Sequence, residues 1–148
     1  MSYQELREQI KFFSDKECGV GATATEIERA EAMLGTKFSE SYRLFLQDYG
    51  WGRFAHQELY GLGSDVPPHL DLIRNTEAER NQMHPAMLLS LVPLLNDGAG
   101  NHYCLDVRKM RDSECPIVFW DHELGEDQNP KPVFDAFDKW LMGLLARL

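Results

Sequence analysis

The sequence lacks the features that mark several large protein classes. No run of apolar residues approaches the ~18–20 that a membrane-spanning helix needs. The N-terminal stretch 1–13 mixes charged and apolar residues, whereas a secretory signal places a positive segment before an apolar one. Only three cysteines are present, an odd number without a C-x-x-C pair. This pattern favours reduced thiols and a cytoplasmic location.

Positive charge is also scarce. Lys and Arg number 15 against 24 Asp and Glu, which gives a formal net charge of −9 at pH 7. A protein that binds nucleic acid needs cations along the phosphate backbone, and an anionic membrane surface attracts cations in the same way. The charge therefore argues against nucleic acid and membrane as partners. It suits a basic protein partner, because complementary potentials raise association rates.

Motifs of the common enzyme classes are missing too. His122-Glu123 has no second histidine at the spacing of a zinc protease, and there is no G-x-S-x-G or phosphate-binding loop. The glycine pairs at 61–63 and 98–100 lack the third glycine and the following helix of a dinucleotide site. The 97–101 loop lacks the ligand pattern of an EF-hand. We therefore expect neither a cofactor nor enzymatic activity.

What is present is an ordinary domain composition, with 43% hydrophobic and 26% charged residues. A length of 148 residues predicts one domain spanning 1–148, because domains most often run to ~100–150 residues. Three apolar runs bounded by turn residues predict adjacent strands at Leu91–Leu95, His102–Val107 and Ile117–Trp120. The Asn-, Asp- and Gly-rich stretch 96–101 predicts a hairpin loop between the first two. Cys104 and Trp120 are predicted to be buried in this sheet.

Helices are predicted on both sides of these strands. Amphipathic spacing predicts a first helix at 2–13, and Thr25 with Glu28 predicts a capping box for a second helix ending at Gly35. The remaining predicted elements are a helix capped by Ser39, strands at 53–54 and 58–62, a polar surface helix at 70–82, loops at 18–21 and 125–132, and a last helix capped by Asp135. The order α-α-α-β-β-α-β-β-β-α predicts an α+β fold, with a central, mainly antiparallel sheet covered by helices.

One group of residues has the types that a metal or catalytic site needs. If the second and third central strands pair, several polar residues lie at one rim of the sheet: Asp97, Asn101, His102, Asp121, His122 and Glu123. Imidazole and carboxylate groups can bind a transition metal. The competing interpretation is a turn, in which Asp97, Gly98, Gly100 and Asn101 serve the backbone. A metal-binding enzyme that uses Asp97, His102, Asp121 and His122 is therefore the weaker hypothesis.

A second group has the types that protein recognition needs. The acidic residues Asp121, Glu123, Glu126 and Asp127 follow the third central strand, and Trp51 lies between two glycines at the end of an element. Tryptophan is enriched where binding energy concentrates, so Trp51 is predicted to be an exposed contact beside these acids. The polar helix at 70–82 competes as a binding surface, but it carries no aromatic residue.

The ordered series of short motifs resembles the SUKH superfamily, in its branch of fungal cell-wall-synthesis regulators (the Smi/Knr type) and bacterial toxin-immunity proteins. The resemblance covers roughly residues 22–145. It is carried by the segments Glu28–Gly35, Ser39 to Leu46, Gly50-Trp51-Gly52, Leu72–Arg80, Asn96–Asp106, Val118–His122 and Asp135 to Leu141.

This resemblance implies an α+β fold without catalytic residues. It also implies a function, since the bacterial members are immunity proteins that bind and neutralise toxins of neighbouring cells, often nucleases. A general intracellular regulatory or scaffold role, as in the fungal members, is the alternative. The expected partner is thus a protein toxin, to which an acidic chain can present a charge like that of nucleic acid.

Overall fold

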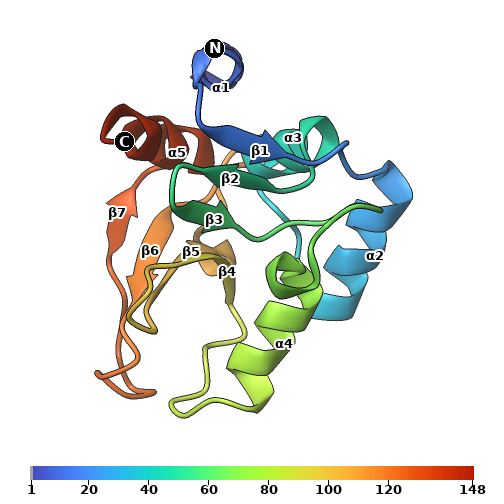
Figure 1. Cartoon of the computed structure of the whole chain (residues 1–148). Coiled ribbons are helices and arrows are strands. Elements are labelled where there is room, and N and C mark those ends of the chain that lie inside the picture. The colour runs from blue at the N-terminus through green and yellow to red at the C-terminus, as the bar shows by residue number, and fades with distance from the viewer. Residues whose placement is uncertain (1) are drawn as a thin grey trace.

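A single antiparallel sheet organises the computed structural model, which describes residues 2–148 (Figure 1). Within this range its seven strands lie in sequence order, so that each strand pairs with the one before and the one after it. The strands are β1 (Lys16–Cys18), β2 (Gly52–Phe54), β3 (Gln57–Leu59), β4 (Leu91–Asn96), β5 (His102–Asp106), β6 (Ile117–Trp120) and β7 (Pro132–Phe134). The predicted α+β class and central antiparallel sheet are confirmed.

Helices pack around this sheet and against one another (Figure 1). Over residues 2–148 they are α1 (Ser2–Phe12), α2 (Ala24–Leu34), α3 (Glu40–Asp48), α4 (Leu72–Asn81) and α5 (Phe137–Ala146), with short 3-10 turns η1 (Pro68–Leu70) and η2 (Val107–Lys109). α1 packs against α5, and α5 also contacts α3 and β7. α4 lies against α2 and β4. The helices therefore link the two ends of the chain to its middle.

The predicted order of elements is wrong at both edges of the sheet. It lacks β1 and β7, and the predicted loops at 18–21 and 125–132 each overlap the end of one of these strands. Both are edge strands of three residues, and β1 contains Lys16 and Glu17 while β7 begins at Pro132. Short, charged or proline-containing strands are typical of sheet edges, and they show no apolar alternation that a sequence pattern could detect.

The predicted capping box of α2 is wrong by two residues. Thr23 caps the helix: its Oγ1 accepts a hydrogen bond from the Glu26 N–H at 3.1 Å, and Glu26 Oε1 accepts one from the Thr23 N–H at 2.9 Å. The sequence contains two overlapping T-x-x-E patterns, and tertiary contacts select the first. Ala22 is buried and donates its N–H to Leu46 O on α3, which holds the chain extended up to Thr23.

The caps of α3 and α5 also differ from the prediction. Ser39 is the N-cap of α3, but its side chain makes no capping hydrogen bond. Asp135 does not cap α5, because the N-cap is Ala136. The exposed Asp135 lies one residue too early, since the buried Phe137 sets the first turn of the helix. The predicted last helix itself is confirmed, and Phe137, Trp140, Leu141, Leu144 and Leu145 are buried along it.

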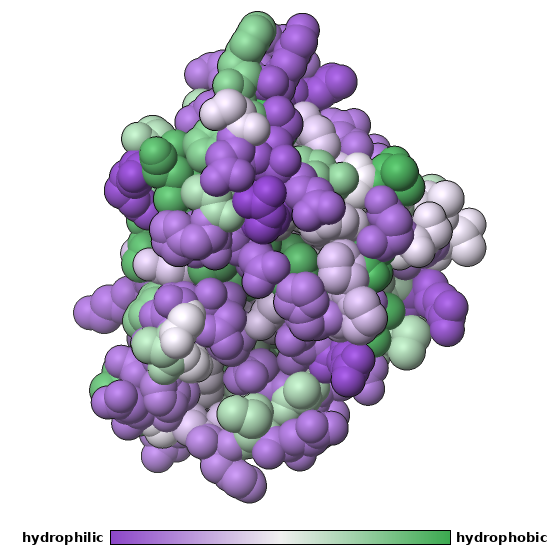
Figure 2. All heavy atoms as spheres, in the orientation of Figure 1, coloured by the Kyte–Doolittle hydropathy of each residue, from purple (hydrophilic) through white to green (hydrophobic). Residues whose placement is uncertain are grey.

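Two hydrophobic cores lie on opposite faces of β5 and β6. Successive side chains alternate along a strand. Leu105 and Ile117 therefore face a main core that includes α1, α2, α3 and α5. Cys104 and Val118 face a small core made of Met87, Leu91, Cys104, Val118 and Trp120. The predicted burial of Cys104 and Trp120 is confirmed, and the outer surface in Figure 2 is mostly hydrophilic.

Candidate functional site

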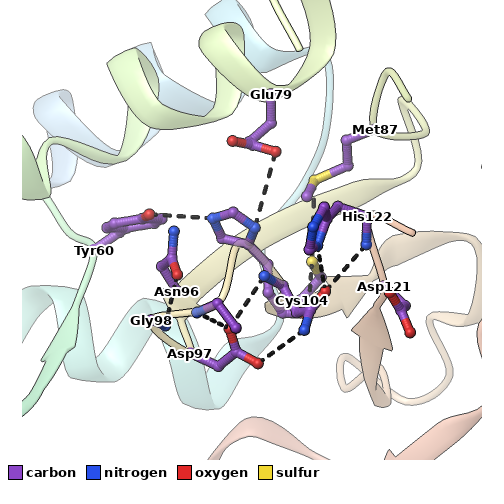
Figure 3. A network of polar contacts seen from close by, with 12 residues as sticks. Tyr60, Glu79, Met87, Asn96, Asp97, Gly98, Cys104, Asp121 and His122 are labelled. Carbon is purple, nitrogen blue, oxygen red and sulfur yellow. Dashed lines mark hydrogen bonds and ion pairs between the residues drawn. The ribbon is translucent and has the colours of Figure 1, made fainter. Parts of the chain in front are cut away.

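His102, the first residue of β5, contacts Tyr60 and Glu79, which are labelled in the polar network of Figure 3. Its side chain is 1% exposed. Nε2 lies 3.2 Å from the Tyr60 hydroxyl, and Nδ1 lies 3.9 Å from Glu79 Oε1. Tyr60 follows β3 and Glu79 belongs to α4, so the network joins three elements that are distant in the sequence. We call these three residues the His102 network.

Burial favours the uncharged form of each group in this network. Desolvation lowers the pKa of His102 from 6.5 to about 4, and it raises the pKa of Glu79 above its usual value. Burial raises the pKa of Tyr60 to about 12. Within residues 2–148, His102 Nδ1 has no hydrogen-bond partner. The contact between Tyr60 and His102 joins β5 to the residue that follows β3, and His102 is almost fully buried within it.

The hairpin loop between β4 and β5 is held by its own side chains. Asp97 Oδ1 accepts hydrogen bonds from the N–H groups of Ala99 (2.8 Å) and Asn101 (3.1 Å), and Oδ2 accepts one from Asn101 Nδ2 (3.1 Å). Partial burial raises the pKa of Asp97, but these hydrogen bonds outweigh it and the pKa is lowered overall. Gly98 and Gly100 have φ of 92° and 90°, a conformation that glycine adopts readily. Asp97 thus serves the turn.

The histidines and aspartates of the metal hypothesis do not converge. His122 Nδ1 lies 2.7 Å from Asn101 Oδ1, and the His122 N–H donates to the same oxygen. Asp121 points away from His122, and Asp97 turns into its own loop (Figure 3). In the part of the chain that the structure describes, no group of three or more His, Cys, Asp or Glu residues is arranged to hold a metal ion. The structure therefore gives no support to the metal-centre hypothesis on Asp97, His102, Asp121 and His122, which needs these side chains to share one ion.

Trp51 is not the exposed contact that the sequence predicts. Its side chain is only 5% exposed, and its Nε1 donates a hydrogen bond to Asp65 Oδ1 at 3.2 Å. Gly19 explains the burial: a Cβ at that position would lie 2.3 Å from the indole Nε1, so only glycine lets the ring pack there. Trp51 therefore fixes the 63–66 turn against the β1 side of the sheet, and it is absent from the binding surface considered below.

Asp121 to Asp127, which we call the acidic loop, lies after β6 and carries the other predicted binding residues. Glu123 is 80% exposed, Glu126 and Asp127 are exposed, and Asp121 is partly buried. Glu126 Oε1 also accepts a hydrogen bond from the Ala86 N–H. The loop therefore presents carboxylates to solvent while it remains attached to the neighbouring segment.

Gln128 fixes the backbone of the acidic loop. Its Oε1 accepts from the Asp121 N–H at 3.1 Å, and its Nε2 donates to Asp121 O at 2.6 Å and to Gly125 O at 3.0 Å. One side chain thus holds both ends of the turn. A loop that is ordered before binding loses less conformational entropy when a partner arrives.

The competing surface, the helix at 70–82, is less exposed than its polar sequence predicts. Thr76 is fully buried on α4. Arg80 donates hydrogen bonds to Leu34 O on α2 and to Leu89 O and Leu91 O near β4. Its polar groups therefore attach α4 to the rest of the fold, and fewer of them remain for a partner.

Sequence patterns did not find three residues that matter here. Tyr60 and Glu79 flank His102, and Gln128 holds the acidic loop. Each partner depends on which elements lie side by side, and no spacing along the chain encodes that. Of the three, only Gln128 could be suspected from the sequence, because it is a polar residue next to a predicted turn.

A family model matches nearly the whole chain. The family model SUKH_5, described as "SMI1-KNR4 cell-wall", matches residues 3–146. Over residues 2–148, no helix has the length and apolar character needed to cross a membrane.

Proposed function

The chain belongs to the SMI1-KNR4 (SUKH) family, and on this premise we propose that it is a non-enzymatic protein-binding module. We infer that it is a bacterial immunity protein. In this proposal it works in the cytoplasm, where it binds a cognate toxin and neutralises it by occupying the toxin's functional surface.

The acidic loop is the observation that carries this proposal. Glu123, Glu126 and Asp127 are exposed on a backbone that Gln128 holds in place. The chain as a whole carries a net charge of −9, so its field favours basic partners at a distance as well as at the loop. The buried His102 network offers no comparable open surface.

A nuclease toxin is the partner class that this charge fits best. A nuclease must bind phosphates, so its active face is cationic. A rigid set of carboxylates competes with the substrate for the same face and is attracted to it over a Debye length of ~8 Å at physiological ionic strength. The acidic loop would then block the toxin without any chemistry.

The test is co-expression with the toxic domain encoded beside this chain. We expect the wild-type chain to restore growth, and the triple charge reversal Glu123→Lys, Glu126→Lys, Asp127→Lys to restore it much less. The matched control reverses three exposed carboxylates on α1 and α2: Glu5→Lys, Glu8→Lys and Glu28→Lys. It changes the net charge equally and should protect almost as well as wild type.

A regulatory or scaffold protein is the second candidate, because the matching family model is described by the words "cell-wall". The same experiment separates the two. If no toxic domain encoded nearby is bound or neutralised, the immunity function is contradicted. The regulatory role then leads, with the acidic loop contacting a different basic protein.

A further inference from the structure

A recess of about 470 Å³ lies beside the acidic loop. Its walls combine apolar side chains with two carboxylates, and its main lining residues are Phe119, Leu124, Pro130, Asp121, Asp127 and Gln128. Phe119 belongs to β6 and the others to the segment before β7. The recess therefore has an aromatic side chain from the sheet on one side and acids from the loop on the other.

Three of the four oxygens of these two carboxylates are free to bind a cation. Asp121 Oδ1 accepts from the Glu123 N–H at 2.9 Å. Over residues 2–148, Asp121 Oδ2 and the Asp127 carboxylate form no hydrogen bond or salt bridge with the rest of the chain. Lys131 also lines the recess, but its single charge is outweighed by the two acids. The recess thus carries a net negative charge.

The walls of the recess are held in place from behind. The Phe119 ring packs against Tyr103, with ring centroids 5.1 Å apart and planes at 58°. Gln128 fixes the loop through Asp121 and Gly125. Leu124, by contrast, is 67% exposed at the mouth of the recess. A fixed wall with an exposed apolar rim is the form of a pocket that receives a partner's side chain.

We propose that this recess receives one arginine side chain of the basic protein partner, and this inference rests on the proposed function. A guanidinium group is planar, stacks on aromatic faces and donates to two carboxylate oxygens at once. Phe119 supplies the aromatic face, and Asp121 and Asp127 supply the acceptors. The ammonium group of lysine is a compact, strongly hydrated point charge, so it fits this flat, partly apolar recess less well than a guanidinium group does.

The direct test is an NMR titration of the full chain with N-acetyl-L-arginine methylamide. We expect saturable shifts of backbone amides between residues 119 and 131, with an affinity about threefold or more above that for the lysine analogue. Asp127→Asn should weaken arginine binding by about threefold or more, and Phe119→Leu should reduce the preference for arginine over lysine. The control Glu28→Gln removes one exposed charge on α2 and should leave the titration unchanged.

The amide spectra also show whether each variant is folded. Equal affinity for the two probes, or shifts that never saturate, would overturn the inference. The inference and the proposed function fail in different ways. If the chain neutralises the toxin but shows no preference for arginine, the proposed function stands and the arginine inference is refuted. If the chain binds the arginine probe but neutralises no toxin, the arginine inference stands and the immunity function is refuted.

Discussion

The His102 network and the acidic loop are both polar, but they use their polar groups in opposite ways. In the network, His102 is 1% exposed and its neighbours on α4 and beside β3 face inward. In the loop, one side chain, Gln128, holds the backbone, and carboxylates such as Glu123 point into solvent.

This difference separates stability from recognition. A polar group inside a protein must be bonded or neutral, because leaving it charged or unpaired there is costly. The network is therefore committed to the fold. Exposed carboxylates contribute little to stability, since solvent and salt screen them. The charges of the acidic loop are thus available to a partner, and changes in the two regions should have separable effects.

His102→Ala should show the largest difference in stability effect between the His102 network and the acidic loop. It removes a buried ring and leaves the Tyr60 hydroxyl without its partner, so we expect the free energy of unfolding to fall by about 3–4 kcal/mol. The triple reversal in the acidic loop should change it by less than about 1 kcal/mol. Urea unfolding at pH 7 measures both, and similar losses for the two variants would refute the separation.

Acidification should lower the free energy of unfolding through the same histidine. The pKa of His102 is 6.5 when unfolded and about 4 when folded. Below pH 6.5 the unfolded chain therefore binds a proton that the folded chain does not accept until about pH 4, and stability falls across this window. The loss from His102 is about 3 kcal/mol, because one pKa unit corresponds to ~1.4 kcal/mol. Glu79, whose raised pKa has the opposite effect, offsets part of it.

A series of urea unfolding curves between pH 7 and pH 4 checks this. The profile of His102→Gln should be flatter than that of wild type, while the triple reversal of the acidic loop should keep the pH dependence of His102. Parallel profiles for wild type and His102→Gln would show that this histidine does not set the pH dependence.

Loosening the acidic loop should have a smaller, local effect. Gln128→Ala removes hydrogen bonds to Asp121 and Gly125, and we expect the Asp121 amide to exchange with solvent about tenfold faster. Amides of β5 should keep their wild-type rates. The control is Asn129→Ala, which truncates the exposed neighbouring amide side chain. An unchanged Asp121 rate would mean that Gln128 does not order the loop.

A site outside both regions provides a scale for these effects. Thr23→Ala should cost about 1 kcal/mol, because Thr23 caps α2, whereas Thr25→Ala should cost only a few tenths. Thermal or urea unfolding compares the two. A larger loss of stability for Thr25→Ala than for Thr23→Ala would show that Thr25 caps α2, as the sequence predicts.

The central part of the fold could be predicted because its strands carry strong local signals. The runs at β4, β5 and β6 are rich in aliphatic and aromatic residues, and the loop at 96–101 contains turn residues. The edges could not be predicted in the same way. β1 and β7 are three-residue strands whose existence depends on a neighbour to pair with, and the α2 cap depends on the contact between Ala22 and Leu46.

The site was less predictable than the fold. The acidic loop was visible in the sequence, because consecutive charges after an apolar strand indicate a surface turn. The position of Trp51 was not, since its burial depends on space left by Gly19, more than thirty residues earlier. The partners of His102 come from α4 and the end of β3, which only the fold brings together.

The rate at which a cognate toxin associates with the chain tests the central claim most directly. It should be measured at low and high salt for wild type, for the acidic-loop reversal and for the matched reversal of Glu5, Glu8 and Glu28. We expect the loop reversal to slow association at low salt by about tenfold or more, the control to slow it much less, and the differences to shrink at high salt. Equal rates and equal salt dependence for the two reversals would contradict recognition through the acidic loop.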